Sequence, residues 1–74
     1  MSQPFDFIKM VETDKGILKV FNPIDTGHVA QAILIGRNFW ANKRIKDNRI
    51  LAAILDDKFT IAITGRNSFE IIPI

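Results

Sequence analysis

Residues 37–50, RNFWANKRIKDNRI, separate two apolar, strand-like parts of the chain and concentrate its positive charge. In this basic segment five cations accompany one acid, Asp47, so its net charge is +4 in a chain that carries +2 overall. The residues outside the basic segment are therefore weakly acidic. One concentrated basic segment indicates an anionic partner that binds at a defined place, and a solvated loop is the alternative.

The chain is short and rich in apolar residues. Its 74 residues are expected to form a single domain, residues 1–74, since a chain of this length holds one hydrophobic core. Hydrophobic residues make up 47% of the sequence and the mean hydropathy is +0.12, which is high for so small a domain. The surplus apolar surface predicts a homo-oligomer, because large exposed apolar patches are rare on soluble monomers.

The sequence contains no cysteine, which excludes disulfides, thiolate zinc sites and cysteine nucleophiles. The N-terminal residues MSQPFDFIKM lack the basic start and apolar run of a secretory signal. No stretch approaches the roughly 20 apolar residues that span a bilayer. A cytoplasmic protein with no membrane partner is expected.

The first part of the chain predicts a β-hairpin. Residues Phe5–Glu12 read as a strand with both faces partly apolar, and Ile17–Phe21 read as its partner. Between them Thr13–Gly16 has the composition of a turn, with a glycine that is free to adopt positive φ.

The run HVAQAILI at residues 28–35 fits two structures, since a short apolar run cannot be assigned by periodicity alone. Glycines at both ends favour a strand over the alternative, a helix capped by Asp25 or Thr26. The tripeptide Gly-Arg-Asn follows an apolar run both at residues 36–38 and at 65–67, and glycine and asparagine are typical of turns.

The basic segment predicts a short helix over residues 38–46, capped by Asn38, with Ala41 and Ile45 four residues apart on one face. A buried strand is then expected at Arg49–Leu55, paired in a hairpin spanning Arg49–Thr64.

The remaining expected elements are a strand at Phe59–Thr64, a turn at residues 65–68 and a last strand at Phe69–Ile74. Pro73 would limit that last strand to an edge or a chain end.

This order predicts a mainly β fold, a small antiparallel barrel or curved sheet of five or six short strands with one short helix near residues 38–46. The segments GHVAQAILIG and DDKFTIAI resemble stretches of the bacterial initiation-factor-one type of OB-fold, which implies an OB-like architecture. No functional residue is carried over, since Asp56 stands where the family turn has glycine. The alternative is an α+β fold with a helical middle and a C-terminal β-hairpin, similar to a small repressor of the Cro type.

Catalytic chemistry finds little support in this sequence. His28 is the only histidine and, without cysteine, cannot complete a usual zinc set. The adjacent Asp56 and Asp57 fall in an expected turn, where such carboxylates bond the backbone. The four glycines form no phosphate loop or dinucleotide fingerprint. We therefore expect no enzymatic activity, no catalytic residue, no metal and no cofactor.

The basic segment combines cations, which neutralise phosphates, with aromatic rings on which bases can stack. This pattern predicts a small non-enzymatic nucleic-acid-binding protein, for RNA or DNA. The alternative is a protein-interaction module, such as an inhibitor or adaptor, that acts through its apolar strands. For Phe39 and Trp40 the alternative is a place in the core. The predicted nucleic-acid-binding residues are Arg37, Phe39, Trp40, Lys43, Arg44, Lys46 and Arg49.

Overall fold

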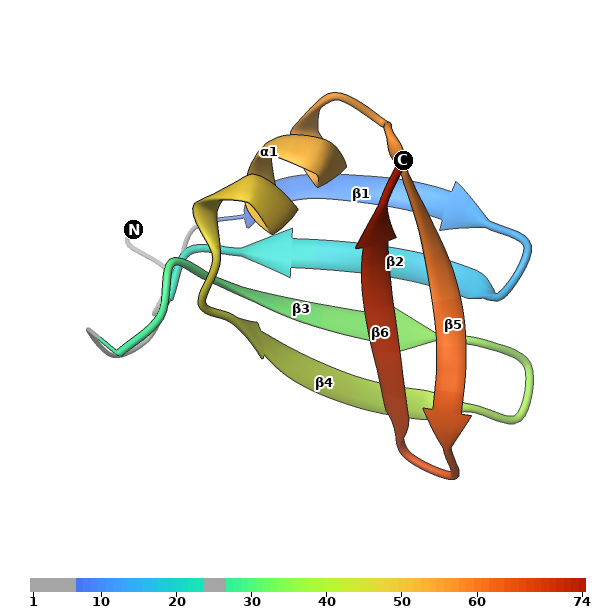
Figure 1. Ribbon diagram of the computed structural model, residues 1–74. Helices are drawn as coiled ribbons and strands as arrows, with labels where there is room; N and C mark the ends of the chain where they lie inside the picture. Colours follow the sequence, from blue (N-terminus) through green and yellow to red (C-terminus); the bar gives the residue numbers. More distant parts are fainter. Residues whose placement is uncertain (1–6, 24–26) are drawn as a thin grey trace.

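The computed structural model describes residues 7–23 and 27–74, which form six strands and one helix (Figure 1). The expected strand start at Phe5 and the possible helix caps Asp25 and Thr26 lie outside the described residues. The elements in chain order are β1 (Phe7–Thr13), β2 (Gly16–Phe21), β3 (Ala30–Ile35), β4 (Trp40–Ile45), α1 (Asn48–Leu55), β5 (Phe59–Gly65) and β6 (Ser68–Pro73).

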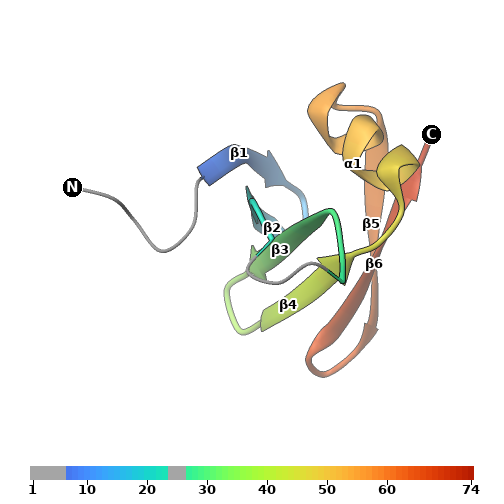
Figure 2. The same ribbon diagram turned by 90° about the vertical axis from the view of Figure 1, so that its left-hand side faces the viewer.

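The strands form two antiparallel sheets. One is a four-stranded meander in the order β1-β2-β3-β4, and the other is the hairpin of β5 and β6. The hairpin lies across one face of the meander (Figure 1), and the view turned by 90° shows α1 on that same side (Figure 2). The mainly β fold is confirmed. Among the described residues the two sheets are not joined by strand pairing, so they do not close into a barrel.

Alternation along the strands builds the core between these two layers. Leu18 and Val20 of β2 point inward, and each is followed or preceded by a residue that points away from the core. Ile54 of α1 and Phe69 of β6 close the core from the other side. Side chains on one face of a strand recur every second residue, so one face of the meander is buried. The buried apolar residues are Leu18, Val20, Ala30, Ala32, Leu34, Ala41, Ile45, Ile54, Ile61, Phe69 and Ile71.

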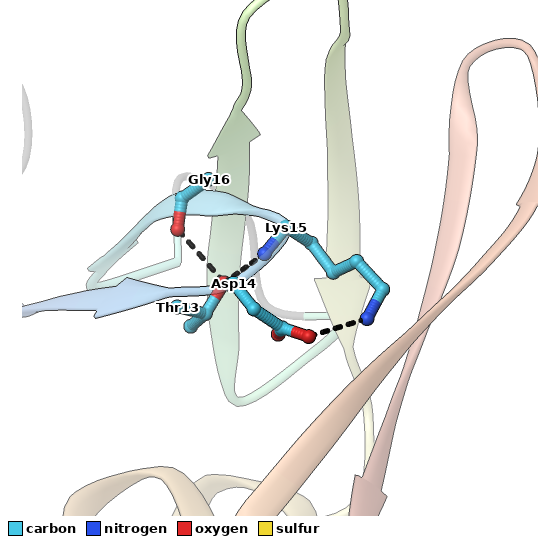
Figure 3. Close-up of polar contacts among 4 residues, drawn as sticks. All are labelled: Thr13, Asp14, Lys15 and Gly16. Atoms are coloured by element: carbon cyan, nitrogen blue, oxygen red, sulfur yellow. Dashed lines mark hydrogen bonds and ion pairs between the residues drawn. The ribbon is translucent and has the colours of Figure 1, made fainter.

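The turn between β1 and β2 has the residues that the sequence predicts (Figure 3). The Thr13 hydroxyl donates to the carbonyl of Gly16 over 2.8 Å and accepts from the amide of Lys15 over 3.1 Å. Gly16 has a φ of +137°. A Cβ atom there would lie 2.5 Å from the carbonyl oxygen of Ile35 on β3. Glycine is therefore required both by the turn and by the neighbouring strand.

The prediction of a helix over residues 38–46 is wrong, because residues 40–45 form β4. Ala41 and Ile45 do share a face, as predicted, but a spacing of four residues places side chains on one face of a strand as well as of a helix. Both are buried, and β4 pairs along its whole length with β3. Residues 36–39 form the hairpin turn, with the Gly36 amide bonded to the Phe39 carbonyl over 2.8 Å.

The prediction of a strand at Arg49–Leu55, and with it the hairpin Arg49–Thr64, is also wrong, because residues 48–55 form α1. The carboxylate of Asp47 accepts the amide of Arg49 over 2.9 Å and caps the first turn. Asp57 ends the helix with a φ of 58°, its amide bonded to Ile54 and the next amide to Ala53. This is a Schellman stop with aspartate in the position that glycine usually takes.

The other predicted elements are confirmed. The run at residues 28–35 contains a strand, β3, rather than a helix. Both Gly-Arg-Asn tripeptides lie in hairpin turns, one before β4 and the other between β5 and β6. Lys9 of β1 connects the four-stranded sheet to α1. Its ammonium donates to the Leu55 carbonyl at the end of α1 and contacts the Asp57 carboxylate, each over 3.0 Å.

Candidate nucleic-acid interface

The basic segment runs along the edge of the four-stranded sheet instead of forming one helical face. Trp40 and Arg44 lie on β4 with side chains directed away from the core, whereas Lys43 lies on the same side as the buried Ala41 and Ile45. The other predicted residues lie before and after the strand: Arg37 in the turn, Phe39 at its end, Lys46 after β4 and Arg49 in the first turn of α1.

The two aromatic residues of the segment have different environments. Phe39 is half-buried and packs against the core, so the core interpretation holds for it. Trp40 is 56% exposed at the first position of β4, opposite Ile35. A large aromatic side chain on the surface of a small domain is unusual, because tryptophan is highly buried on average. The core interpretation of Trp40 is therefore wrong, and its indole is available to a partner.

Lys43 and Arg49 are held by acids. The Lys43 ammonium contacts the Glu70 carboxylate of β6 over 3.1 Å. The Arg49 guanidinium donates to Asp47 over 3.1 Å, and this hydrogen bond lowers the pKa of Asp47 and raises that of Arg49. Arg37 and Lys46 are exposed at opposite ends of β4. The sequence could not show the pairing of Lys43, since Glu70 is 27 residues away from it, whereas Asp47 and Arg49 are only two residues apart.

A groove of about 280 Å³ lies beside the inner side of β4, where the strand meets α1 and β6. Its cations come from the end of β4, and its floor contains Ile45, Ile50 and Ile71. Because Glu70 and Asp47 also line it, the groove is not uniformly basic. The lining residues are Lys43, Arg44, Ile45, Lys46, Asp47, Ile50, Glu70 and Ile71.

The outer face of the four-stranded sheet is a surface that the sequence argument missed. The hairpin and α1 cover the opposite face, and no described element lies over this one (Figure 2). The register places Trp40 beside Ile35, and Arg44 beside Gln31, on this face. The sequence did contain an indication of this surface, because both faces of the first predicted strand are partly apolar. The error at residues 38–46 hid it, because a helix there would not have extended the sheet.

The other residues considered for chemistry are His28 and possible metal ligands. His28 is buried just before β3. Within residues 7–23 and 27–74, no group of three or more histidine, cysteine or acidic residues could hold a metal ion. In the same residues, α1 is too short to cross a bilayer and no longer helix occurs.

Comparison of the chain with protein-family models, with curated proteins and with solved structures found no match. The exposed side chains of β4 and of the sheet face beside it are therefore the features that bear on function.

Proposed function

We propose that this protein binds nucleic acid and has no enzymatic activity of its own. The exposed cations of the basic segment contact phosphates along β4, and Trp40 stacks on a base. The observation that carries the proposal is the exposed Trp40 indole at the start of an edge strand that also carries Lys43 and Arg44. Aromatic stacking and phosphate neutralisation are the two interactions that sequence-tolerant nucleic-acid binders combine.

The geometry of β4 supports a contact that follows a backbone. A strand rises about 3.3 Å per residue, so Arg37 and Lys46 lie as much as about 30 Å apart. Arg44 lies between them on the outer face of the sheet, four residues after Trp40 on the same strand. An extended polyanion that lies along this edge contacts all three cations in turn. We propose that the sheet binds oligonucleotides in the manner of an OB-fold, which presents a curved antiparallel sheet to them.

Lys43 and Arg49 are the predicted cations whose ion pairs bear directly on phosphate binding. Lys43 and Arg49 must leave Glu70 and Asp47 before they contact phosphate, so we expect smaller contributions from them. Phe39 packs against the core and supports the turn, so stacking is assigned to Trp40 alone. The phosphate contacts that we propose are Arg37 and Lys46, which are exposed at the two ends of β4, and Arg44, whose side chain lies on the outer face between them.

The test is fluorescence anisotropy with labelled oligonucleotides over a salt series. The variant R37A/R44A/K46A should bind more weakly to every sequence. The slope of log K against log salt should flatten by roughly 2 to 3, since each phosphate contact contributes about 0.7 on single strands and 0.9 on duplex.

The matched control is K15A/K58A/R66A, which removes three cations from the turns and hairpin outside the basic segment. It should keep most of the affinity, because overall charge falls equally but the β4 cations are intact. Equal losses in the two variants, or no binding by the wild type at low salt, would remove the proposal.

A second candidate function is that of a protein-interaction module, whose partner is another protein or a second copy of this chain. Exposed apolar side chains outside β4 favour it, in particular Leu55 of α1, Ile72 of β6 and Ile74 at the chain end. Sedimentation at micromolar concentration separates an oligomer from an 8.4 kDa monomer. Absence of nucleic-acid affinity at moderate salt would favour this candidate over the first.

A further inference from the structure

The outer face of the four-stranded sheet is a continuous array of side chains from all four strands. Strand pairing sets Glu12, Ile17, Ile35 and Trp40 in one row across the sheet. The next row holds Met10, Lys19, Ile33 and Asn42. The third holds Phe7, Phe21, Gln31 and Arg44.

This face is apolar and aromatic although it is not covered by a described element. Phe7 is 52% exposed, Met10 54% and Trp40 56%. The rings of Phe7 and Phe21 meet edge to face, with centroids 5.6 Å apart and an interplanar angle of 73°. That packing fixes the Phe7 ring while half of its side chain stays accessible.

The charges of the face are unequal. Lys19 lies in the central row, between Met10 and Ile33, and Arg44 lies at the β4 edge. Among the twelve residues of these three rows the one acid is Glu12, which lies on β1 at the opposite edge of the sheet from Arg44. A second copy packed on this face would desolvate Lys19 with no acid in its own row, and an unpaired buried charge is costly. A polyanion with flat apolar bases provides both the charge and the surface.

We infer that this sheet face is a base-stacking platform that selects single-stranded nucleic acid, an inference that rests on the proposed function above. Bases of a single strand can be spread over Trp40 and Phe7, while Lys19 and Arg44 hold the backbone. Four strands span about 14 Å from β1 to β4, which is wider than the roughly 12 Å major groove of duplex DNA. The face therefore contacts a duplex only at its phosphates, with the bases out of reach.

Trp40 is the single tryptophan of the chain, so its intrinsic fluorescence reports on this face. The probes are an oligo-dT strand of about 12 nucleotides, within the site sizes of single-strand binders, and a duplex of the same length. The single strand should quench and shift the emission at saturation, and the duplex should leave it nearly unchanged.

The decisive variant is F7A, which removes a ring outside the basic segment. Loss of one stacking partner should weaken single-strand binding by about 5- to 150-fold and leave duplex binding unchanged. The matched control is I72A, which truncates a side chain of similar exposure, 45%, on β6. It should change neither affinity, and circular dichroism of both variants verifies that they are folded.

The outcomes separate this inference from the function on which it rests. Salt-dependent binding of both probes with equal affinity, no change in Trp40 emission and equal behaviour of F7A and I72A would overturn the platform and leave phosphate binding standing. No binding of either probe would overturn both. A dimer in sedimentation that F7A dissociates and that no oligonucleotide perturbs would overturn the platform and assign the face to a second copy.

Discussion

Three truncations in α1 test whether residues 48–55 form a helix or the strand that the sequence favours. Ile54 is fully buried, Leu51 is half-buried against the core and Leu55 is 47% exposed. In a helix Leu51 and Ile54 share a face, since three residues are close to one turn. In a strand Leu51 and Ile54 would point to opposite sides, so they could not both face the core.

The expected magnitudes follow from burial. I54A should cost roughly 2–5 kcal/mol, the range for truncating a buried isoleucine or leucine. L51A should cost less but clearly more than L55A, which should stay within about 1 kcal/mol because its side chain is half in water. For a 74-residue domain a free energy of unfolding of roughly 4–11 kcal/mol is typical. I54A is therefore expected to fold unless the wild-type value lies at the lower end of this range.

Urea denaturation followed by far-UV circular dichroism provides the free energies of unfolding. In a thermal scan I54A should lower Tm by at least about 8 °C, since each kcal/mol shifts a domain of this size by about 4–8 °C. If I54A does not fold, I54V offers a milder step of about 0.5–1.5 kcal/mol. Equal costs for L51A and L55A, with a smaller cost at Ile54, would refute the helical assignment.

Two further predictions concern the ends of α1. D57G should be more stable than D57A by about 1 kcal/mol in urea denaturation. Both variants lose the contact with Lys9, but only glycine accepts the positive φ without strain. Equal stabilities would contradict the Schellman stop. The hydrogen bond from Arg49 lowers the pKa of Asp47 below 3.8 in the folded chain, so its stabilising effect is present above that value and is lost as the pH falls through the folded pKa. D47N keeps a capping oxygen but does not titrate, so the advantage of the wild type over D47N in urea midpoint should shrink on acidification; a difference independent of pH would count against it.

Turn chemistry and period-two alternation made much of this fold predictable. The residues Thr13–Gly16 include the glycine that the first turn requires, and Gly-Arg-Asn appears in two of the hairpin turns. These signals are local, so they can be read without knowledge of the tertiary structure. Confirmed in this way are the first hairpin, β3 and the two strands of the C-terminal hairpin.

The sequence predicts a helix before Lys46 and a strand after it, whereas the structure has β4 and then α1. This reversal has a physical cause. Ala41 and Ile45 satisfy both periodicities, so only pairing with β3 decides between them. The apolar content of RILAAIL predicts a strand, although its two alanines favour a helix. The better signal was Asp47, an N-cap residue directly before the apolar run.

The site was predictable as a composition but not as a surface. Five cations and two aromatics in one segment could be counted, but the partners of Lys43 and Phe39 come from other parts of the chain. Glu70 holds Lys43 from β6, and the core holds Phe39. Such pairings depend on the path of the chain in space, which no local pattern encodes.

The strand at residues 40–45 also changes which nucleic acid the segment suits. A helix over 38–46 would have gathered its cations around a cylinder of the size that enters a major groove. On β4, Trp40 and Arg44 instead lie on one face, and successive outward side chains are roughly 7 Å apart, along the edge of an open sheet. Contacts arranged in a line on a broad apolar face suit an extended chain whose bases are unpaired. The strand at residues 40–45 therefore supports the proposed platform for single strands better than a helix at these residues would.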